Sequence, residues 1–443
     1  MPEKTGKNKF YGWVLLPILC LVYSIPIGFA MYGPPVINTF MAEDLKLQRW
    51  QVNVGYSIIG IVLGLGSLFI PWLMNRFGPK KTLAIGAVLI AVSSILMALL
   101  GNIMVGFFGH SYPLIYWIIC LAVGLGVSFG SMVPIQALVL LWFNVHRALA
   151  MGLVLGGGAI GGFIYPQIIS SFIRLFGNDW KAGWYVIAIA CFIGALVAML
   201  AVRNRPEEIG QHPDGLSPQQ LEQTAKSARH NLIRTYRSPV NWTPADAFKT
   251  RSLWLLMLGT SAIFFLWQLL LTQAPAHLHD RGFSASDPLL FLQPAFIYGL
   301  ILAFSIIGRL SISVLGERIE PRFIMACASL LLVTGGSLFW LASKENLWAV
   351  YLFPLFTGIG FGATYVSIPL IIGNYYGVSS FADIMRVVNP VCTVFQFSAP
   401  TLAGLMYDIN HTYGLAILIA CFMGLTGIVM ILFCKPPLPD QTV

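Results

Sequence analysis

Apolar stretches of about 20 residues recur along almost the whole chain, and they restrict the possible fold more than any other feature. A helix of that length crosses roughly 30 Å of hydrocarbon, where every backbone polar group needs a partner within the protein. Hydrophobic residues make up 57% of the chain and charged residues 10%, whereas an ordinary soluble domain carries about 25% charge. The stretches are too long and too evenly apolar for barrel strands, so we predict an all-α membrane protein.

Twelve such stretches are present, in two groups of six. The first group comprises Tyr11–Gly33, Gln51–Met74, Thr82–Gly101, Tyr112–Leu140, Leu149–Ile173 and Ala182–Val202. The second group comprises Ser252–Ala276, Leu289–Leu315, Phe323–Ala342, Leu347–Gly373, Ala382–Tyr407 and Tyr413–Cys434. A polar, proline-containing segment separates the groups. We therefore predict a six-helix bundle over residues 1–202, a linker over 203–250, and a second bundle with a short tail over 251–443.

The two halves also repeat each other weakly. The chain reads Asn75-Arg76-Phe77-Gly78-Pro79-Lys80 after the second stretch, and Glu317-Arg318-Ile319-Glu320-Pro321-Arg322 after the eighth, the second of its own half. A parallel repeat of six helices is typical of transporters that hold their substrate near the midplane, between two pseudo-symmetric bundles.

The distribution of basic residues predicts the orientation in the membrane, because lysine and arginine concentrate in short cytoplasmic loops. With the N-terminus in the cytoplasm, 19 of the 26 basic residues fall inside and 6 outside, which leaves Arg309 within a span. We therefore expect both termini to be cytoplasmic. Membrane topology also explains the net charge of +9, so the charge indicates no nucleic-acid partner.

The chain shows no pattern typical of a metal site, a cofactor site or a catalytic centre. All seven cysteines lie in or at the ends of predicted spans, no CxxC motif occurs, and the seven histidines are dispersed. The predicted spans do not supply a nucleophile, a base and a residue to orient the base, which together would form a catalytic site. We expect no metal, no cofactor and no enzymatic activity.

Arg309 is the most informative candidate residue. A charge near the centre of a bilayer costs roughly 2.5 to 3.5 kcal/mol on insertion scales, so such residues usually face a water-filled pathway. A guanidinium there indicates a negatively charged cargo, because its planar fork pairs with a carboxylate and stays charged. The alternative is a structural role, in which the side chain extends along about 12 Å of helix to the cytoplasmic interface.

Several motifs, taken in order and with their spacing, resemble the major facilitator superfamily. The loop Asn75–Lys81 is similar to the family's signature after the second helix, although Pro71 and Asn75 stand where a glycine and an aspartate are usual. Phe10-Tyr11-Gly12-Trp13, Arg147-Ala148-Leu149-Ala150-Met151-Gly152 and Arg205-Pro206-Glu207-Glu208-Ile209-Gly210 resemble the bacterial branch of monocarboxylate transporters and oxalate:formate antiporters.

This resemblance implies roles for particular residues. In that branch an arginine eight residues before the acidic loop residue binds the substrate carboxylate, and here Arg309 precedes Glu317 by eight. The resemblance also implies that Phe361 and Tyr365 line the substrate cavity, with core packing as the alternative for Phe361. The antiporter's second intramembrane cation, a lysine, is matched here by Cys392, which favours a monoanion over oxalate.

Four further residues complete the predicted substrate-binding set. Ser305 lies one turn before Arg309 and could bond the cargo or its own helix backbone. Asn389 would supply a neutral hydrogen bond from the eleventh span. Gln268 and Tyr32 are polar groups at mid-depth that need partners, in the cavity or between helices.

The sequence thus predicts a secondary transporter that moves a small, lactate-like organic monocarboxylate by alternating access. No Asp or Glu lies in the middle of a predicted span, so proton symport and anion exchange both stay open as the coupling mode. The alternative function is efflux of a drug, a siderophore or another organic solute. We expect a monomer in the bacterial cytoplasmic membrane, with the lipid bilayer, a small organic anion and, for symport, a proton as partners.

Overall fold

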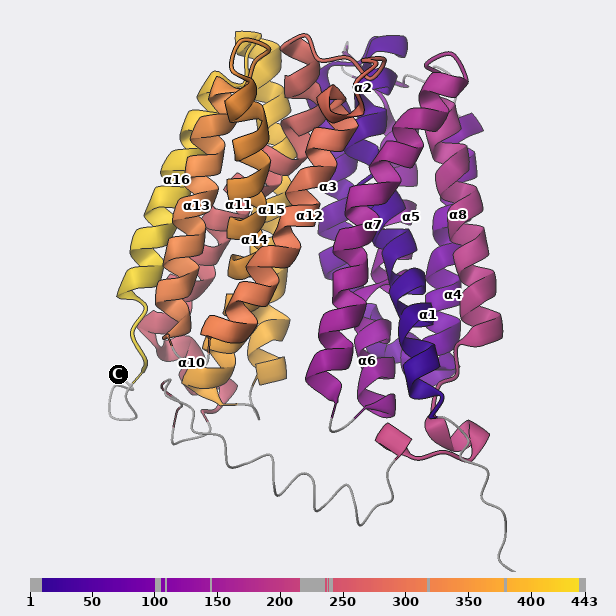
Figure 1. The fold of residues 1–443 in the computed structure, drawn as a ribbon, viewed down its shortest axis with the longest axis vertical. Helices are drawn as coiled ribbons and strands as arrows, with labels where there is room; N and C mark the ends of the chain where they lie inside the picture. The colour runs from indigo at the N-terminus through magenta and orange to yellow at the C-terminus, as the bar shows by residue number, and fades with distance from the viewer. Residues whose placement is uncertain are drawn as a thin grey trace, which may run out of the picture.

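The computed structural model describes residues 10–99, 105–107, 110–143, 146–215, 236, 238, 242–316, 319–377 and 381–437, and nearly all of them are helical (Figure 1). The first half contains α1 (Gly12–Ile25), the π-helical η1 (Pro26–Met31), α2 (Pro34–Asp44), α3 (Arg49–Gly66), η2 (Ser67–Phe69), α4 (Ile70–Leu99), β1 (Val105–Phe107), β2 (His110–Tyr112), α5 (Leu114–Gly130), α6 (Met132–Trp142), α7 (Arg147–Leu175) and α8 (Trp180–Ala201).

The second half follows a linker with η3 (Pro206–Ile209), η4 (Pro213–Gly215) and α10 (Pro244–Lys249). It contains α11 (Arg251–Asp280), η5 (Leu290–Leu292), α12 (Pro294–Leu315), α13 (Pro321–Leu341), α14 (Leu347–Tyr376), α15 (Phe381–Asn410) and α16 (Gly414–Phe433). The described helices of the linker, η3, η4 and α10, lie at one end of the molecule, which we call the linker end (Figure 1). The opposite end, where α2 lies, we call the far end (Figure 1).

Ten helical segments of the described chain are long and apolar enough to cross a membrane. One of them, Arg49–Leu99, holds the second and third predicted spans, and α15 adds a further one, so the predicted set of twelve is confirmed. The second and third spans meet at Gly78, whose φ of 80° only glycine adopts readily, followed by Pro79. The backbone of Gly78 is not helical, so α4 consists of two helices joined by a sharp turn at this residue.

The ends of several spans differ from the sequence prediction. The first span continues past Gly33 into α2, and the fourth is broken at Ser131, whose φ of −127° and ψ of −121° are not helical. The short antiparallel pairing of β1 with β2 was not predicted. Glu317, the acid expected in the second repeat loop, lies outside the described residues, and the boundaries of the predicted domains remain a prediction.

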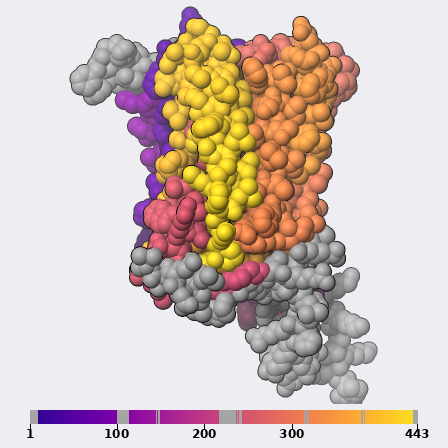
Figure 2. Space-filling view, turned by 90° about the vertical axis from the view of Figure 1, so that its left-hand side faces the viewer, coloured from indigo at the N-terminus to yellow at the C-terminus, as the bar shows by residue number. Residues whose placement is uncertain are grey.

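The buried core follows the two halves of the sequence. One cluster of buried apolar residues comes almost wholly from residues 242–434, and two others come almost wholly from residues 15–202. Figure 1 shows the two groups of helices side by side. The surface of the second group carries α16, where Leu418 and Phe422 are each 67% exposed (Figure 2). Such an apolar outer face is solvated by lipid.

The two groups of helices touch along α3 with α15 and along α7 with α12. A Cβ at Gly60 or Gly64 of α3 would collide with Phe397 or Thr393 of α15, and Ser57 bonds Thr401 at 2.8 Å. On the other side, Gly162 of α7 packs against Leu302 of α12. Small residues let these helices approach closely, which brings side chains of both halves together.

Candidate functional site

Arg309 of α12 lies at the junction between the two halves. Gly308, the residue before it, is packed against α14 so closely that a Cβ would collide with the carbonyl of Ile359. This contact fixes the rotation of α12 about its own axis and leaves Arg309 able to reach α7. Its Nη1 donates a hydrogen bond of 3.2 Å to the carbonyl oxygen of Leu155, and its guanidinium lies 5.7 Å from the ring centroid of Tyr365.

Aromatic rings form a wall next to Arg309. The rings of Tyr365 and Phe361, one turn apart on α14, have centroids 5.5 Å apart, and Phe361 stacks on Trp267 of α11 at 3.5 Å with an interplanar angle of 3°. Phe264 completes the wall. The Tyr365 hydroxyl reaches across to the sulfur of Met132 in the first half, at 3.5 Å. Arg309 and this wall can hold an anion with a short apolar part.

A polar chain continues from the wall along the junction. Gln268, the neighbour of Trp267, donates to the Tyr56 hydroxyl at 3.3 Å and accepts from Gln396 of α15 at 2.7 Å. Tyr56 in turn donates to the carbonyl of Met31 at 3.2 Å. Gln268 is 1% exposed, so these bonds satisfy an amide that would be costly to bury alone. This series of hydrogen bonds connects α3 to α11 and α15.

The other predicted site residues have different surroundings. Tyr32 is half-buried, packs against Gly162, and accepts a bond from the Tyr298 hydroxyl through its own carbonyl, at 3.0 Å. Ser305 is fully buried against α14 at Gly362, and its hydroxyl donates to the carbonyl of Leu302 at 2.6 Å.

Asn389 is exposed, and it lies one turn toward the linker end from Thr393, the residue of α15 that meets α3. The structure thus brings Arg309, Tyr365, Phe361 and Gln268 to one junction, with Tyr32 beside it. Ser305 is packed against Gly362 of α14 and Asn389 lies exposed on α15, so neither belongs to that group.

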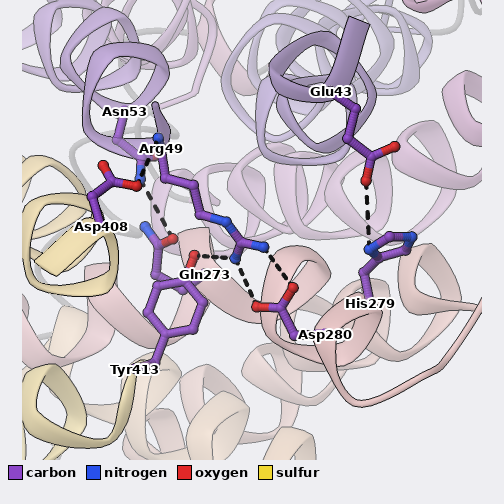
Figure 3. A network of polar contacts seen from close by, with 8 residues as sticks. All are labelled: Glu43, Arg49, Asn53, Gln273, His279, Asp280, Asp408 and Tyr413. Carbon is purple, nitrogen blue, oxygen red and sulfur yellow. Dashed lines mark hydrogen bonds and ion pairs between the residues drawn. The ribbon is translucent and has the colours of Figure 1, made fainter. Parts of the chain in front are cut away.

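A second polar network at the far end was not predicted (Figure 3). Arg49, the first residue of α3, binds the carboxylate of Asp280 at the end of α11 through two bonds, of 2.8 and 2.5 Å. It also donates to the Tyr413 hydroxyl at 2.7 Å and lies 3.8 Å from the centroid of the Tyr407 ring. The network joins the first half to α11, to α15 and to Tyr413, which directly precedes α16.

The carboxylate of Asp408 strengthens this junction by capping α3. It accepts from the backbone nitrogens of Arg49 at 3.2 Å and Trp50 at 2.9 Å, which are among the first nitrogens of the helix and have no partner within it. A carboxylate at a helix N-terminus is also favoured by the helix dipole. The far end of the junction is therefore closed by polar contacts as well as by helix packing.

The described residues contain no group of three or more His, Cys, Asp or Glu side chains placed to hold a metal ion. What the junction offers chemically is reversible binding: a fixed positive charge, neutral hydrogen-bonding groups and stacked rings, all between two helix bundles.

Comparison with known proteins agrees with this architecture. The profile of the Major Facilitator Superfamily matches residues 18–396. The probable L-galactonate transporter of Escherichia coli (strain K12) is 22% identical over 91% of this chain and 85% of its own. Monocarboxylate transporter 12 of Xenopus laevis is 21% identical over 95% of this chain and 88% of its own. Agnestins efflux protein AgnL12 of Paecilomyces divaricatus is 29% identical, over only 44% of each chain.

Among solved structures, the nucleoside transporter NupG superposes with a TM-score of 0.69 at 12% sequence identity, covering 95% of this chain and 98% of that one. At that identity the likeness concerns the fold alone. The profile match, which spans most of the chain, concerns ancestry as well. The chain belongs to the major facilitator superfamily and is an integral membrane transporter of organic solutes, not an enzyme.

Proposed function

We propose that this protein moves a small organic monocarboxylate across the membrane by alternating access, with Arg309 as the partner of the carboxylate. The observation that carries the proposal is the position of the guanidinium. It belongs to a span of the second half and donates to a carbonyl of the first half, beside a wall of aromatic rings. A ligand bound there touches both halves, as alternating access requires.

The present bond of Arg309 explains how a carboxylate could displace it. A neutral carbonyl is a weaker partner for a guanidinium than a carboxylate, which accepts two parallel bonds. Hydrogen bonds to charged groups contribute about 1.5 to 3 kcal/mol net, so with some apolar contact against Tyr365 we expect micromolar to millimolar affinity. Binding also holds a carboxylate against this guanidinium within the membrane, and opposite charges that move as a pair lower the cost of moving the two halves past each other.

The surroundings of Cys392 support a monoanion. This residue of α15 is 4% exposed and its sulfur lies 3.5 Å from the Ser261 hydroxyl, in an uncharged environment. A dicarboxylate would need a second cation in the membrane, and Arg309 is the only basic residue that lies more than five residues from either end of a predicted span. The relatives named for L-galactonate and for monocarboxylates support an organic acid as the substrate.

The basic-residue distribution supports a cytoplasmic linker end, with both termini on that side of the cytoplasmic membrane. In that orientation the closed far end faces outward. Coupling proceeds by proton symport or by exchange of one anion for another, because the chain carries no carboxylate at the centre of a span. Uptake driven by an imposed pH gradient into empty vesicles supports symport, whereas uptake that requires internal substrate supports exchange.

The deciding experiment measures thermal stabilisation of the purified protein by L-lactate, pyruvate, oxalate and a panel of cationic drugs. Wild type is compared with Arg309→Gln and with Arg251→Gln, which removes the same charge from an exposed position at the linker end. We expect stabilisation by the monocarboxylates in wild type and Arg251→Gln, and none in Arg309→Gln. Equal stabilisation of all three proteins would refute the binding role of Arg309.

A second candidate function is efflux of a flat organic solute. It is favoured by the stacked rings of Trp267 and Phe361, and by the partial similarity to an efflux protein. The same panel separates the two functions. Stabilisation by aromatic cations but not by monocarboxylates, unchanged in Arg309→Gln, would favour efflux.

A further inference from the structure

A pocket of about 170 Å³ lies at the far end of the junction, where its lining includes Tyr56 but not Arg309. It is bounded by Asn38 and Thr39 of α2, Arg49 and Asn53 of α3, and Thr272 and Gln273 of α11. Its walls thus come from both halves of the protein. The volume is below the roughly 300 to 1,000 Å³ of pockets for drug-sized ligands, so it suits a solute of a few carbon atoms.

Arg49 in this pocket already holds a carboxylate, that of Asp280. The two bonds of 2.8 and 2.5 Å, the Tyr413 hydroxyl and the Tyr407 ring together form a complete carboxylate-binding arrangement. The side chains of Arg49 and Asp280 are 23% and 26% exposed, so the pair is within reach of solvent. Arg49 belongs to the first half and Asp280 to the second. Any movement that parts the halves at the far end separates them and leaves Arg49 lining the pocket.

Asn38 supplies a second, independent sign of a ligand. Asn38 is 8% exposed, it lines the pocket, and its Oδ1 has no hydrogen-bond partner among the described residues. By contrast, the hydroxyl of its neighbour Thr39 already donates to the carbonyl of Val36 at 2.8 Å. A buried acceptor without a partner is costly, and a hydroxyl group of a ligand would satisfy it.

We propose that this pocket is an entry subsite for a small hydroxycarboxylate, whose carboxylate replaces Asp280 on Arg49 and whose hydroxyl donates to Asn38. Asp280 is then an internal competitor of the substrate: it holds Arg49 while the far end is closed and gives it up when the far end opens. This inference rests on the proposed function for the carboxylate class of its ligand, and it adds the hydroxyl and a second binding position.

The test measures the half-saturation value, which is the substrate concentration that gives half-maximal transport. It is measured for L-lactate and for propionate, which lacks the hydroxyl, in right-side-out and inside-out vesicles from expressing bacteria. Cleavage of the linker by added trypsin identifies the vesicles that expose the linker end. The variants are Arg49→Gln, Asn38→Leu and Asp280→Asn. Arg281→Gln is the matched control, because it removes a positive charge at the same end from a residue that does not line the pocket and whose side chain donates to the carbonyl of Trp340.

We expect Arg49→Gln to raise half-saturation at the far end about tenfold for both acids and to leave it unchanged at the linker end. Asn38→Leu should raise it for L-lactate alone, and Asp280→Asn should lower it for both acids. The unchanged value at the linker end also shows that each variant is folded.

Two results would overturn the subsite. One is an Arg49→Gln protein whose half-saturation matches wild type and Arg281→Gln, or changes equally at both ends. The other is an Asn38→Leu protein in which the ratio of the half-saturation values for L-lactate and propionate equals that of wild type. A wild-type protein that carries neither acid from either side would instead refute the proposed function itself.

Discussion

Replacement of Gly404 by alanine should open the far end. Gly404 lies on α15 where it crosses α3, and a Cβ there would stand 2.8 Å from both the backbone nitrogen and the Cα of Trp50. These are backbone atoms, so no side-chain rotation can relieve the contact. The helices must separate instead, and the separation acts directly on the cap that Asp408 places on α3.

The expected magnitude follows from these contacts. Overpacking by one methyl group typically costs about 1 to 3 kcal/mol. The bonds from Trp50 and Arg49 to Asp408, of 2.9 and 3.2 Å, lengthen as the helices part, and each contributes about 0.5 to 1.5 kcal/mol or somewhat more because the acceptor is charged. If the cost falls on the closed far end alone, as alternating access implies, the closed population falls about 5- to 150-fold relative to the open one.

Distances between two spin labels across the far end, measured by pulsed electron paramagnetic resonance, report this population. Labels are placed at the exposed residues Leu175 of α7 and Glu345, which precedes α14, after replacement of the seven free cysteines. We expect a shift toward longer distances in Gly404→Ala. Gly156→Ala is the control, because a Cβ at Gly156 meets nothing within 4 Å. A Gly404→Ala protein with the same distances and thermal midpoint as wild type and the control would refute the packing argument.

Three further predictions concern single contacts. Asp408→Asn should lower the free energy of unfolding by about 0.5 to 2 kcal/mol through the weakened cap on α3, measured by thermal unfolding. Phe361→Leu should weaken monocarboxylate binding severalfold in the thermal-shift panel, because it removes the ring that stacks on Trp267 and supports Tyr365. The pKa of Asp246 in the linker helix α10 is lowered by hydrogen bonds from Thr243 and Lys249, so its stabilisation is complete above its ordinary value of 3.8 and is lost only as the pH falls through the lowered pKa. Hydrogen exchange of α10 should therefore be unaffected by ionisation of Asp246 between about pH 5 and 8 once the intrinsic exchange rate is subtracted, and a sharp loss of protection in that range would contradict this.

The spans could be predicted from sequence because lipid imposes a length and a composition on each one separately. Helix α11 is an example: its apolar run and its basic and polar ends fix its position without knowledge of any neighbour. The interruptions were harder. The turn at Gly78 was visible as a glycine followed by a proline, whereas Ser131 breaks the fourth span with no local signal in its own residue type.

The rotation of each helix about its axis could not be predicted, because it depends on packing between helices. Ser305 and Arg309 lie one turn apart, so the sequence favours the same face for both. The close approach of α12 to α14 at Gly362 instead buries Ser305 and leaves Arg309 at the edge, where it reaches Leu155 of α7. A difference of a few tens of degrees in rotation separates a packed residue from one that can meet a ligand.

The far-end network was missed for a different reason. Arg49 and Asp280 are 231 residues apart, and neither residue alone indicates the other as its partner. In the sequence Arg49 stands among the basic residues of the loops, and nothing near it in the chain marks it as one half of a pair between the two bundles. The two charges meet only because the start of α3 lies next to the end of α11 in the folded protein.

The two arginines of the junction differ in what holds them, and this difference suggests the order of events in a transport cycle. Arg49 is bound by a carboxylate of the opposite half, so the far end stays closed until the halves part or an anion competes. Arg309 donates to a neutral carbonyl of the opposite half, and a substrate carboxylate, which accepts two parallel bonds, is a stronger partner for a guanidinium than that carbonyl. A substrate that moved from the far end to the centre would thus first compete with a carboxylate of the protein for Arg49 and then replace a carbonyl on Arg309. The Asp280→Asn and Arg309→Gln variants separate these two steps, because the first should change half-saturation on one side only and the second should abolish transport from both.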